Sequence, residues 1–133
     1  MKQEFIDLAK YRLEKAKSTL SDAKKYFVDA TLDSTVNRIY YAMFYAVNAL
    51  LITRELSSPK HAGVRALFNQ EFVKTGLVEK QQGKFFSEMF DTRQEGDYKD
   101  FIEFKREDVE LWLNHAGIFI SRIEELILKE IGK

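Results

Sequence analysis

Apolar residues recur every three or four positions along most of this 133-residue chain. The clearest stripe lies near the C-terminal end and comprises Val109, Trp112, Ala116, Phe119, Ile120, Ile123, Leu126 and Ile127. This spacing places side chains on one face of an α-helix, because a strand would alternate at every second residue. The single proline and six glycines leave few places to turn the chain, which favours long helices. We therefore expect an all-α, up-and-down antiparallel bundle of four to five helices, forming a single domain over residues 1–133.

Two more helices follow from the same periodicity in the first half of the chain. One apolar stripe covers residues 5–27 and is interrupted only by Arg12. The next helix should begin at Asp33 or Ser34, whose side-chain oxygens can accept hydrogen bonds from free backbone N–H groups. This second helix is apolar on more than one side, so it should lie centrally in the bundle or in a subunit contact.

The second half of the chain is marked by its few helix-breaking residues. Ser58-Pro59 predicts the start of a third helix that reaches residue 73. A fourth helix should cover residues 78–90, although Gly83 interrupts it. Residues 91–104 contain mixed charges and Gly96 without a clear period, which predicts a loop before the last helix.

Composition limits the classes of function. Lys plus Arg equals Asp plus Glu at 21 each, so any contact with RNA would have to be local. The absence of cysteine excludes disulfides and thiolate metal sites. No apolar run resembles a signal peptide or a membrane span, and we expect a cytoplasmic protein. Two distant histidines make no metal site, and we expect no cofactor.

Three groups of residues are candidates for a functional site. His61 lies in the first turn of the expected third helix, where the helix dipole would keep the imidazole neutral, although a surface or capping role is the favoured interpretation. The segment 93–98 places an arginine, two carboxylates and a tyrosine around a glycine. Asn37-Arg38 is a polar pair at the start of a strongly apolar helix. For His115, packing or simple exposure is the better interpretation.

Taken together, three segments resemble the HEPN superfamily, and in particular its small stand-alone prokaryotic branch. They are residues 37–45 (NRIYYAMFY), 58–64 (SPKHAGV) and 93–98 (RQEGDY), and the resemblance extends over about residues 5–128. It implies an antiparallel helical bundle, usually a homodimer, often encoded beside a minimal nucleotidyltransferase as a toxin–antitoxin pair. Active members of the family are metal-independent ribonucleases. They use an arginine that is followed, after four to six residues, by a histidine near the start of the last long helix.

The chain departs from that pattern at the histidine. Arg93 fills the arginine position, whereas Asp97 and Tyr98 stand where histidine is expected. An ordinary aspartate has a pKa several units below neutral pH, so Asp97 cannot simply replace an imidazole as a general base. Arg54 and His61 satisfy the spacing on a different segment.

Helix direction gives an expectation for the geometry of the site. The second helix should be about 30 Å long at 1.5 Å per residue. If helix directions alternate, Arg54, His61 and the segment 93–98 should share one end of the bundle. Arg38 should then lie nearer the opposite end.

The resemblance also gives Tyr98 a possible role. In related toxin–antitoxin pairs, a tyrosine shortly after the motif arginine is the residue that the nucleotidyltransferase modifies with a nucleotide. Tyr98 is the match here, two residues closer to the arginine than in that pattern. The alternative is that Tyr98, followed by Phe101 and Phe104, packs on the bundle.

Three functions remain open on the sequence. The first is a HEPN-type partner of a minimal nucleotidyltransferase, directed at RNA, with an incomplete ribonuclease motif. The second is an active metal-independent endoribonuclease with a rearranged site, in which His61 moves the 2′-hydroxyl proton and Arg93 stabilises the phosphorane charge. The third is a non-catalytic structural or ligand-binding bundle.

Overall fold

The computed structural model describes the backbone of residues 1–98 and 103–133 and the side chains of residues 1–94 and 103–133. The helices are α1 (Gln3–Asp29), α2 (Leu32–Ile52), α3 (His61–Phe68), the π-helical turn η1 (Asn69–Val73), α4 (Lys80–Tyr98) and α5 (Arg106–Ile131). The described residues contain no strand. The predicted all-α helical bundle is confirmed.

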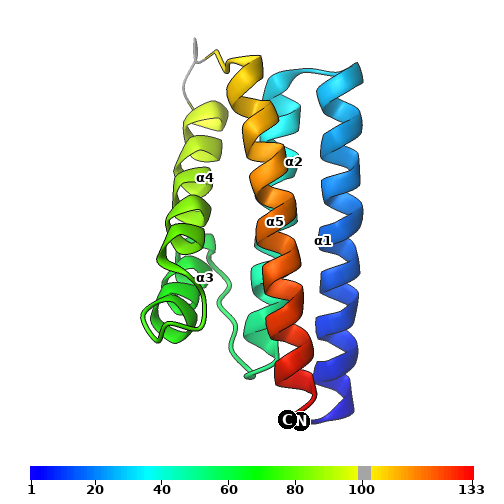
Figure 1. Cartoon of the computed structure of the whole chain (residues 1–133), viewed down its shortest axis with the longest axis vertical. Coiled ribbons are helices and arrows are strands. Elements are labelled where there is room, and N and C mark those ends of the chain that lie inside the picture. The colour runs from blue at the N-terminus through cyan, green and yellow to red at the C-terminus, as the bar shows by residue number, and fades with distance from the viewer. Residues whose placement is uncertain (99–102) are drawn as a thin grey trace.

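The frame of the bundle consists of α1, α2 and α5 (Figure 1). α1 lies against α2 and α5 and runs opposite to both, while α3 and α4 cover α2 on another side. Five aromatic side chains are completely buried between these helices: Tyr40, Phe68, Phe72, Phe86 and Phe119. Burying a phenylalanine contributes about 1.5–3 kcal/mol, so this aromatic core fixes how α3, α4 and α5 sit against α2. Among the described residues, no helix is both long and apolar enough to cross a membrane.

The linker between α2 and α3 determines which residues meet. α2 ends in a turn in which Leu56 N–H donates to the Leu51 carbonyl over 3.0 Å, with Glu55 at a positive φ of 58°. The chain then runs back alongside α2 before α3 starts, so α3 points in the same direction as α2 (Figure 1). Helix directions therefore do not alternate at this point.

Two helix starts differ from the sequence predictions. The cap of α2 is Thr31, whose Oγ1 accepts from Ser34 N–H over 3.1 Å, and neither Asp33 nor Ser34. α3 begins at His61 and not at Pro59, because Lys60 is still extended, with φ −109° and ψ 140°. Ser58 Oγ accepts from the Lys60 N–H over 3.3 Å, which closes a turn before the helix.

Gly83 does not interrupt α4 but allows a close helix contact. A Cβ atom at Gly83 would lie 2.7 Å from Cγ2 of Val73 in η1. Real Cβ atoms do not approach other atoms that closely, so the absence of a side chain at Gly83 lets α4 pack directly on η1.

The loop predicted over residues 91–104 is wrong in its first half. α4 continues through Arg93 and Gly96 to Tyr98. A glycine inside a helix costs about 1 kcal/mol relative to alanine, and packing of the helix can exceed that cost. Arg93 supplies such packing, because its side chain contacts two tyrosines of α2.

Candidate functional site

Two adjacent tyrosines of α2 form the centre of the candidate site. Tyr40 is completely buried, whereas Tyr41 is half-buried, because consecutive residues of a helix point about 100° apart. Their ring centroids lie 5.3 Å apart in an edge-to-face arrangement. Tyr40 therefore belongs to the core, and Tyr41 reaches the rim where other elements bring polar side chains.

His61, the first residue of α3, packs against this pair. Its Nδ1 lies 2.9 Å from the Tyr40 hydroxyl oxygen. The imidazole stacks on Phe44 with ring centroids 4.1 Å apart and lies edge-on to Tyr41 at 5.7 Å. Its Nε2 has no partner among the described residues and is not among their buried unpartnered atoms, so it reaches solvent.

The hydrogen bond with Tyr40 favours one tautomer of His61. Within the described part of the chain, the buried Tyr40 hydroxyl has no other hydrogen-bond partner. A buried hydroxyl that only accepted would leave its own proton unsatisfied, which is costly. The arrangement in which Tyr40 donates to Nδ1 avoids that cost. His61 then presents an Nε2–H donor to solvent.

The charge state of His61 agrees with this arrangement. Burial lowers the pKa of the imidazole, and the nearby positive charge of Arg93 lowers it further. The ring is therefore neutral at pH 7. Burial also raises the pKa of Tyr40, so its hydroxyl keeps its proton.

Two guanidinium groups lie on the same tyrosine. Arg93 of α4 donates from one terminal nitrogen to the Tyr41 hydroxyl over 3.0 Å, and its Cζ is 5.3 Å from the Tyr41 centroid. Arg38 of α2 places its Cζ 5.2 Å from the same centroid. Asn37 Oδ1 orients Arg38 by accepting from its terminal nitrogen over 2.9 Å and from its Nε over 3.2 Å. Arg38 makes no ion pair with any carboxylate in the described part of the chain.

The structure thus brings together four residues that the sequence singled out: Asn37, Arg38, His61 and Arg93. The expectation for Arg38 was wrong, since it lies with Arg93 and not at the opposite end. The cause is the returning linker, which starts α3 beside Tyr40 rather than beyond the end of α2.

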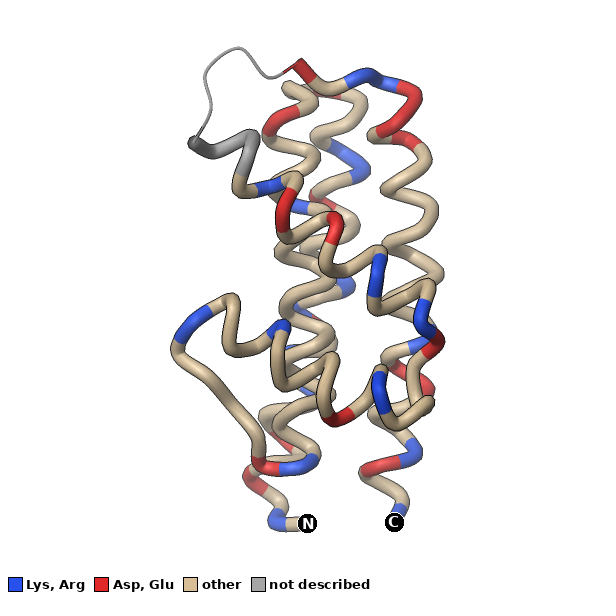
Figure 2. Tube along the Cα trace, turned by 90° about the vertical axis from the view of Figure 1, so that its left-hand side faces the viewer, with Lys and Arg blue, Asp and Glu red and all other residues tan. Residues whose placement is uncertain are grey.

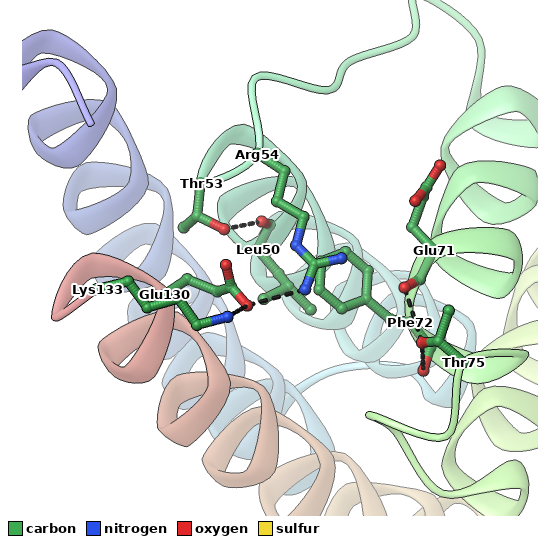
Figure 3. Close-up of polar contacts among 8 residues, drawn as sticks. All are labelled: Leu50, Thr53, Arg54, Glu71, Phe72, Thr75, Glu130 and Lys133. Atoms are coloured by element: carbon green, nitrogen blue, oxygen red, sulfur yellow. Dashed lines mark hydrogen bonds and ion pairs between the residues drawn. The ribbon is translucent and has the colours of Figure 1, made fainter.

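Arg54 does not lie with the other candidate residues. The expectation that Arg54 and Arg93 share one end of the bundle was wrong. Its guanidinium lies 4.4 Å from the Phe72 ring centroid and donates to Glu130 Oε1 over 2.9 Å. Figure 3 shows this group at the ends of α2 and α5, where Lys133 also contacts Glu130. Arg54 therefore joins three elements, and its chance spacing to His61 has no counterpart in space.

Asp97 and Tyr98 lie in the last turn of α4, and their side chains are outside the described residues. Their backbone positions are helical, with Asp97 one turn after Arg93. His115 lies on α5, exposed, with its ring 5.5 Å from that of Phe85.

Sequence reasoning missed Tyr40, Tyr41 and Arg65 as parts of the site. Arg65 follows His61 by one helical turn, and its Cζ lies 4.1 Å from the Phe90 centroid while it pairs with Asp91 at 3.2 Å. The consecutive tyrosines, polar-tipped rings in an otherwise apolar helix, were the available signal.

The chemistry of this arrangement suits an anion. Two guanidinium groups and the imidazole ring of His61 lie around Tyr41, and arginine binds phosphate oxygens through charge-assisted hydrogen bonds. In the part of the chain that the structure describes, no three histidine, aspartate or glutamate side chains are grouped so as to hold a metal ion. Elsewhere, basic and acidic residues are intermixed along the trace (Figure 2), so a site for a polyanion has to be local.

Comparison with known proteins agrees with the fold and the sequence motifs. The profile of the HEPN domain family matches residues 9–126. A UPF0332 protein of Thermotoga maritima is 48% identical over 120 residues, which cover 90% of this chain and 91% of the relative. Two proteins of Methanocaldococcus jannaschii that are named as candidate toxins are 38% and 35% identical, covering 91% and 90% of this chain and 83% and 87% of their own lengths. The chain belongs to the HEPN domain family.

Proposed function

We propose that this protein is the RNA-directed toxin of a toxin–antitoxin pair whose partner is a minimal nucleotidyltransferase. Family membership and the two relatives named as candidate toxins support the toxin role. The nucleotidyltransferase partner follows from the resemblance to the stand-alone prokaryotic branch of the family.

The observation that carries the RNA-directed part is the convergence of Arg38, Arg93 and His61 on Tyr41. Because burial and the charge of Arg93 lower the pKa of His61, its ring is neutral at pH 7 and its Nε2–H is a neutral donor. A phosphodiester has one negative charge and two terminal oxygens, and these fit two guanidinium groups and one neutral donor. Phosphate contacts of this kind supply most of the affinity of sequence-tolerant RNA binding.

A second candidate activity is metal-independent RNA cleavage at the same site, and the closeness of neutral His61 to Arg93 favours it. In this reaction, Nε2 of His61 would take the proton of the 2′-hydroxyl group as the 2′-oxygen attacks the adjacent phosphorus. Arg93 would stabilise the charge on the phosphorane, and the 5′-oxygen would leave and take up a proton from water. The reaction requires the less favoured His61 tautomer, with the proton on Nδ1, so we place binding before cleavage.

Both activities can be tested in one set of variants. We expect Arg93→Gln to weaken binding of single-stranded RNA about tenfold or more, because it removes a charge-assisted contact worth about 1.5–3 kcal/mol. His61→Gln should weaken binding several-fold. His115→Gln is the matched control, since it replaces the other histidine, on an exposed face of α5, and it should bind like the wild type.

The same proteins, incubated with total RNA in EDTA, decide between binding and cleavage. Cleavage by the wild type that disappears in His61→Gln would establish the ribonuclease. Wild-type affinity in both Arg93→Gln and His61→Gln would contradict an RNA site at Tyr41.

The proposed nucleotidyltransferase partner is tested by measuring growth of the host cell and the intact mass of the chain. Expression of the chain alone should slow growth of the host cell, and co-expression of a minimal nucleotidyltransferase encoded beside it should restore growth. Incubation of the two proteins with ATP should add nucleotide mass to the wild type and not to Tyr98→Phe. An equal mass shift in both would exclude Tyr98 as the acceptor, and growth that is unaffected by the chain would contradict the toxin role.

A further inference from the structure

The candidate site continues beyond Tyr41 along α2 to a lysine of α1. Tyr45 follows Tyr41 by one helical turn, and their ring centroids are 5.9 Å apart. Lys15 of α1 is exposed and places its Nζ 4.5 Å from the Tyr45 centroid. We call Lys15, Tyr45, Tyr41 and Arg38 the tyrosine row.

Both cations of the tyrosine row contact the ring of a tyrosine. Lys15 lies on Tyr45, and Arg38 lies on Tyr41. Neither cation makes an ion pair within the described part of the chain, whereas Lys17, two residues from Lys15, is bound to Glu124 at 2.6 Å. A cation on an aromatic face is held in place while its remaining N–H groups stay available to a ligand. The row therefore presents two cations that contact rings and form no ion pair within the described residues.

The positions of these charges suit successive phosphates of one strand. The contacts at Tyr45 and Tyr41 place Lys15 Nζ no more than about 10 Å from the Tyr41 centroid, around which Arg38 and Arg93 gather. Among the described cation contacts, Lys15 lies on Tyr45 whereas Arg38 and Arg93 lie on Tyr41, so Lys15 is placed to bind a neighbouring phosphate of the same chain. The protein has no net charge, and its basic and acidic residues are intermixed along the trace (Figure 2), which does not suit the many phosphate contacts of a duplex.

We propose that the tyrosine row binds single-stranded RNA over more than one nucleotide, with Lys15 as the outer phosphate contact and the Arg38–Arg93–His61 group as the inner one. This inference rests on the proposed function and specifies its ligand. A site limited to the inner group would bind a mononucleotide as well as a longer strand. A row of contacts predicts that affinity rises with strand length until Lys15 is reached.

The test compares Lys15→Ala with Lys10→Ala. Both variants remove one positive charge from an exposed position of α1, but residue 10 lies roughly 140° away around the helix. Binding of uridine monophosphate and of an eight-residue oligouridylate is measured by competition and by fluorescence anisotropy at several salt concentrations. We expect Lys15→Ala to weaken oligouridylate binding about three- to tenfold. The plot of log affinity against log salt concentration should become less steep by about 0.7, because one phosphate contact is lost. Lys10→Ala should match the wild type, and mononucleotide binding should be unchanged in both.

The outcomes separate this inference from the proposed function. If Lys15→Ala binds oligouridylate like the wild type while Arg93→Gln does not, the row is rejected and the inner site stands. If Lys15→Ala and Lys10→Ala weaken binding equally, affinity depends on the net charge of the protein and not on the position of Lys15, and the row is rejected. If Arg93→Gln also binds like the wild type, the RNA-directed function falls as well. If Lys15→Ala changes only the molecular mass in solution, the row is covered by a second copy of the chain and not by RNA.

Discussion

The hydrogen bond between Tyr40 and His61 determines which imidazole nitrogen of the candidate site carries the proton. The Tyr40 hydroxyl lies 2.9 Å from Nδ1 and is buried in the core. A fixed tautomer distinguishes a histidine that donates to a ligand from one that acts as a base. The protonation of His61 is therefore the property to measure at this scale.

Tyr40→Phe should release this tautomer. In the wild type, ¹⁵N NMR should show His61 protonated at Nε2, with its pKa below the ordinary value because of burial and Arg93. Removal of the hydroxyl should give a mixture of tautomers and cost about 0.5–1.5 kcal/mol in the free energy of unfolding. The resonances are assigned with His115→Gln. An Nδ1–H signal for His61 in the wild type would contradict the donor role and favour the ribonuclease.

At the residue scale, the sequence singled out four side chains that the structure brings together, but it did not predict their neighbours. His61, Arg93, Asn37 and Arg38 came from motifs and from polar residues in apolar surroundings. The Tyr40–His61 contact joins residues 21 positions apart, and it depends on the path of the linker. No periodicity in the chain encodes that path.

At the scale of elements, two glycines in helix interiors differ in whether a side chain would fit at their position. Gly83 of α4 lets the helix contact Val73. A Cβ at Gly117 of α5 would lie 3.9 Å from Leu20 Cδ2, an ordinary contact distance. Only the first position requires glycine.

Gly117→Ala should therefore stabilise the protein by about 0.5–1 kcal/mol through helix propensity. Gly83→Ala should destabilise it by about 1–3 kcal/mol, because Val73, which packs against the core, would have to move. Denaturant unfolding of both variants measures the difference. Equal stabilisation by both would contradict the close contact between α4 and η1.

The clamp formed by Arg54, Phe72 and Glu130 joins the ends of α2, η1 and α5 (Figure 3). The hydrogen bond from Arg54 holds the pKa of Glu130 below its ordinary value. Since the folded-state pKa is the lower one, this contribution to stability is fully present above the unfolded pKa of about 4.3. It is lost as the pH falls through the folded-state value.

Arg54→Met keeps most of the apolar stem on Phe72 and removes the charge. We expect it to lower the free energy of unfolding by about 1–2 kcal/mol at pH 7, since the two side chains are only 28% and 13% exposed. The difference from the wild type should shrink below pH 4. Arg122→Met is the control, because its partner Glu79 is 54% exposed, and it should cost less than about 1 kcal/mol. A pH-independent loss in Arg54→Met would contradict the charge contribution.

Helix existence was predictable from apolar spacing, and helix ends were less so. The stripe of α5 is buried at seven of its eight predicted positions, with Trp112 partly exposed. The end of α4 was not predictable, because Gly96 and mixed charges indicate a loop, whereas contacts of Arg93 with α2 stabilise a helix. Such long-range packing overrides local propensity.

At the scale of the whole molecule, we predict a two-fold homodimer. α5 carries apolar surface that the bundle does not cover, with Leu111 and Ile118 at 52% and 59% exposure, and the net charge of zero does not oppose association. Light scattering at tens of micromolar should give twice the chain mass of 15.6 kDa. A value equal to the chain mass would contradict the dimer.

The central claim is that RNA binds where Arg38, Arg93 and His61 meet Tyr41, and an NMR titration that follows both histidines tests it most directly. A short single-stranded RNA is added to the wild-type protein while the imidazole signals of His61 and His115 are recorded. We predict that the His61 signals shift in a saturable manner and that those of His115, on the exposed face of α5, stay in place. RNA that binds with His115 shifting and His61 unchanged would contradict the account.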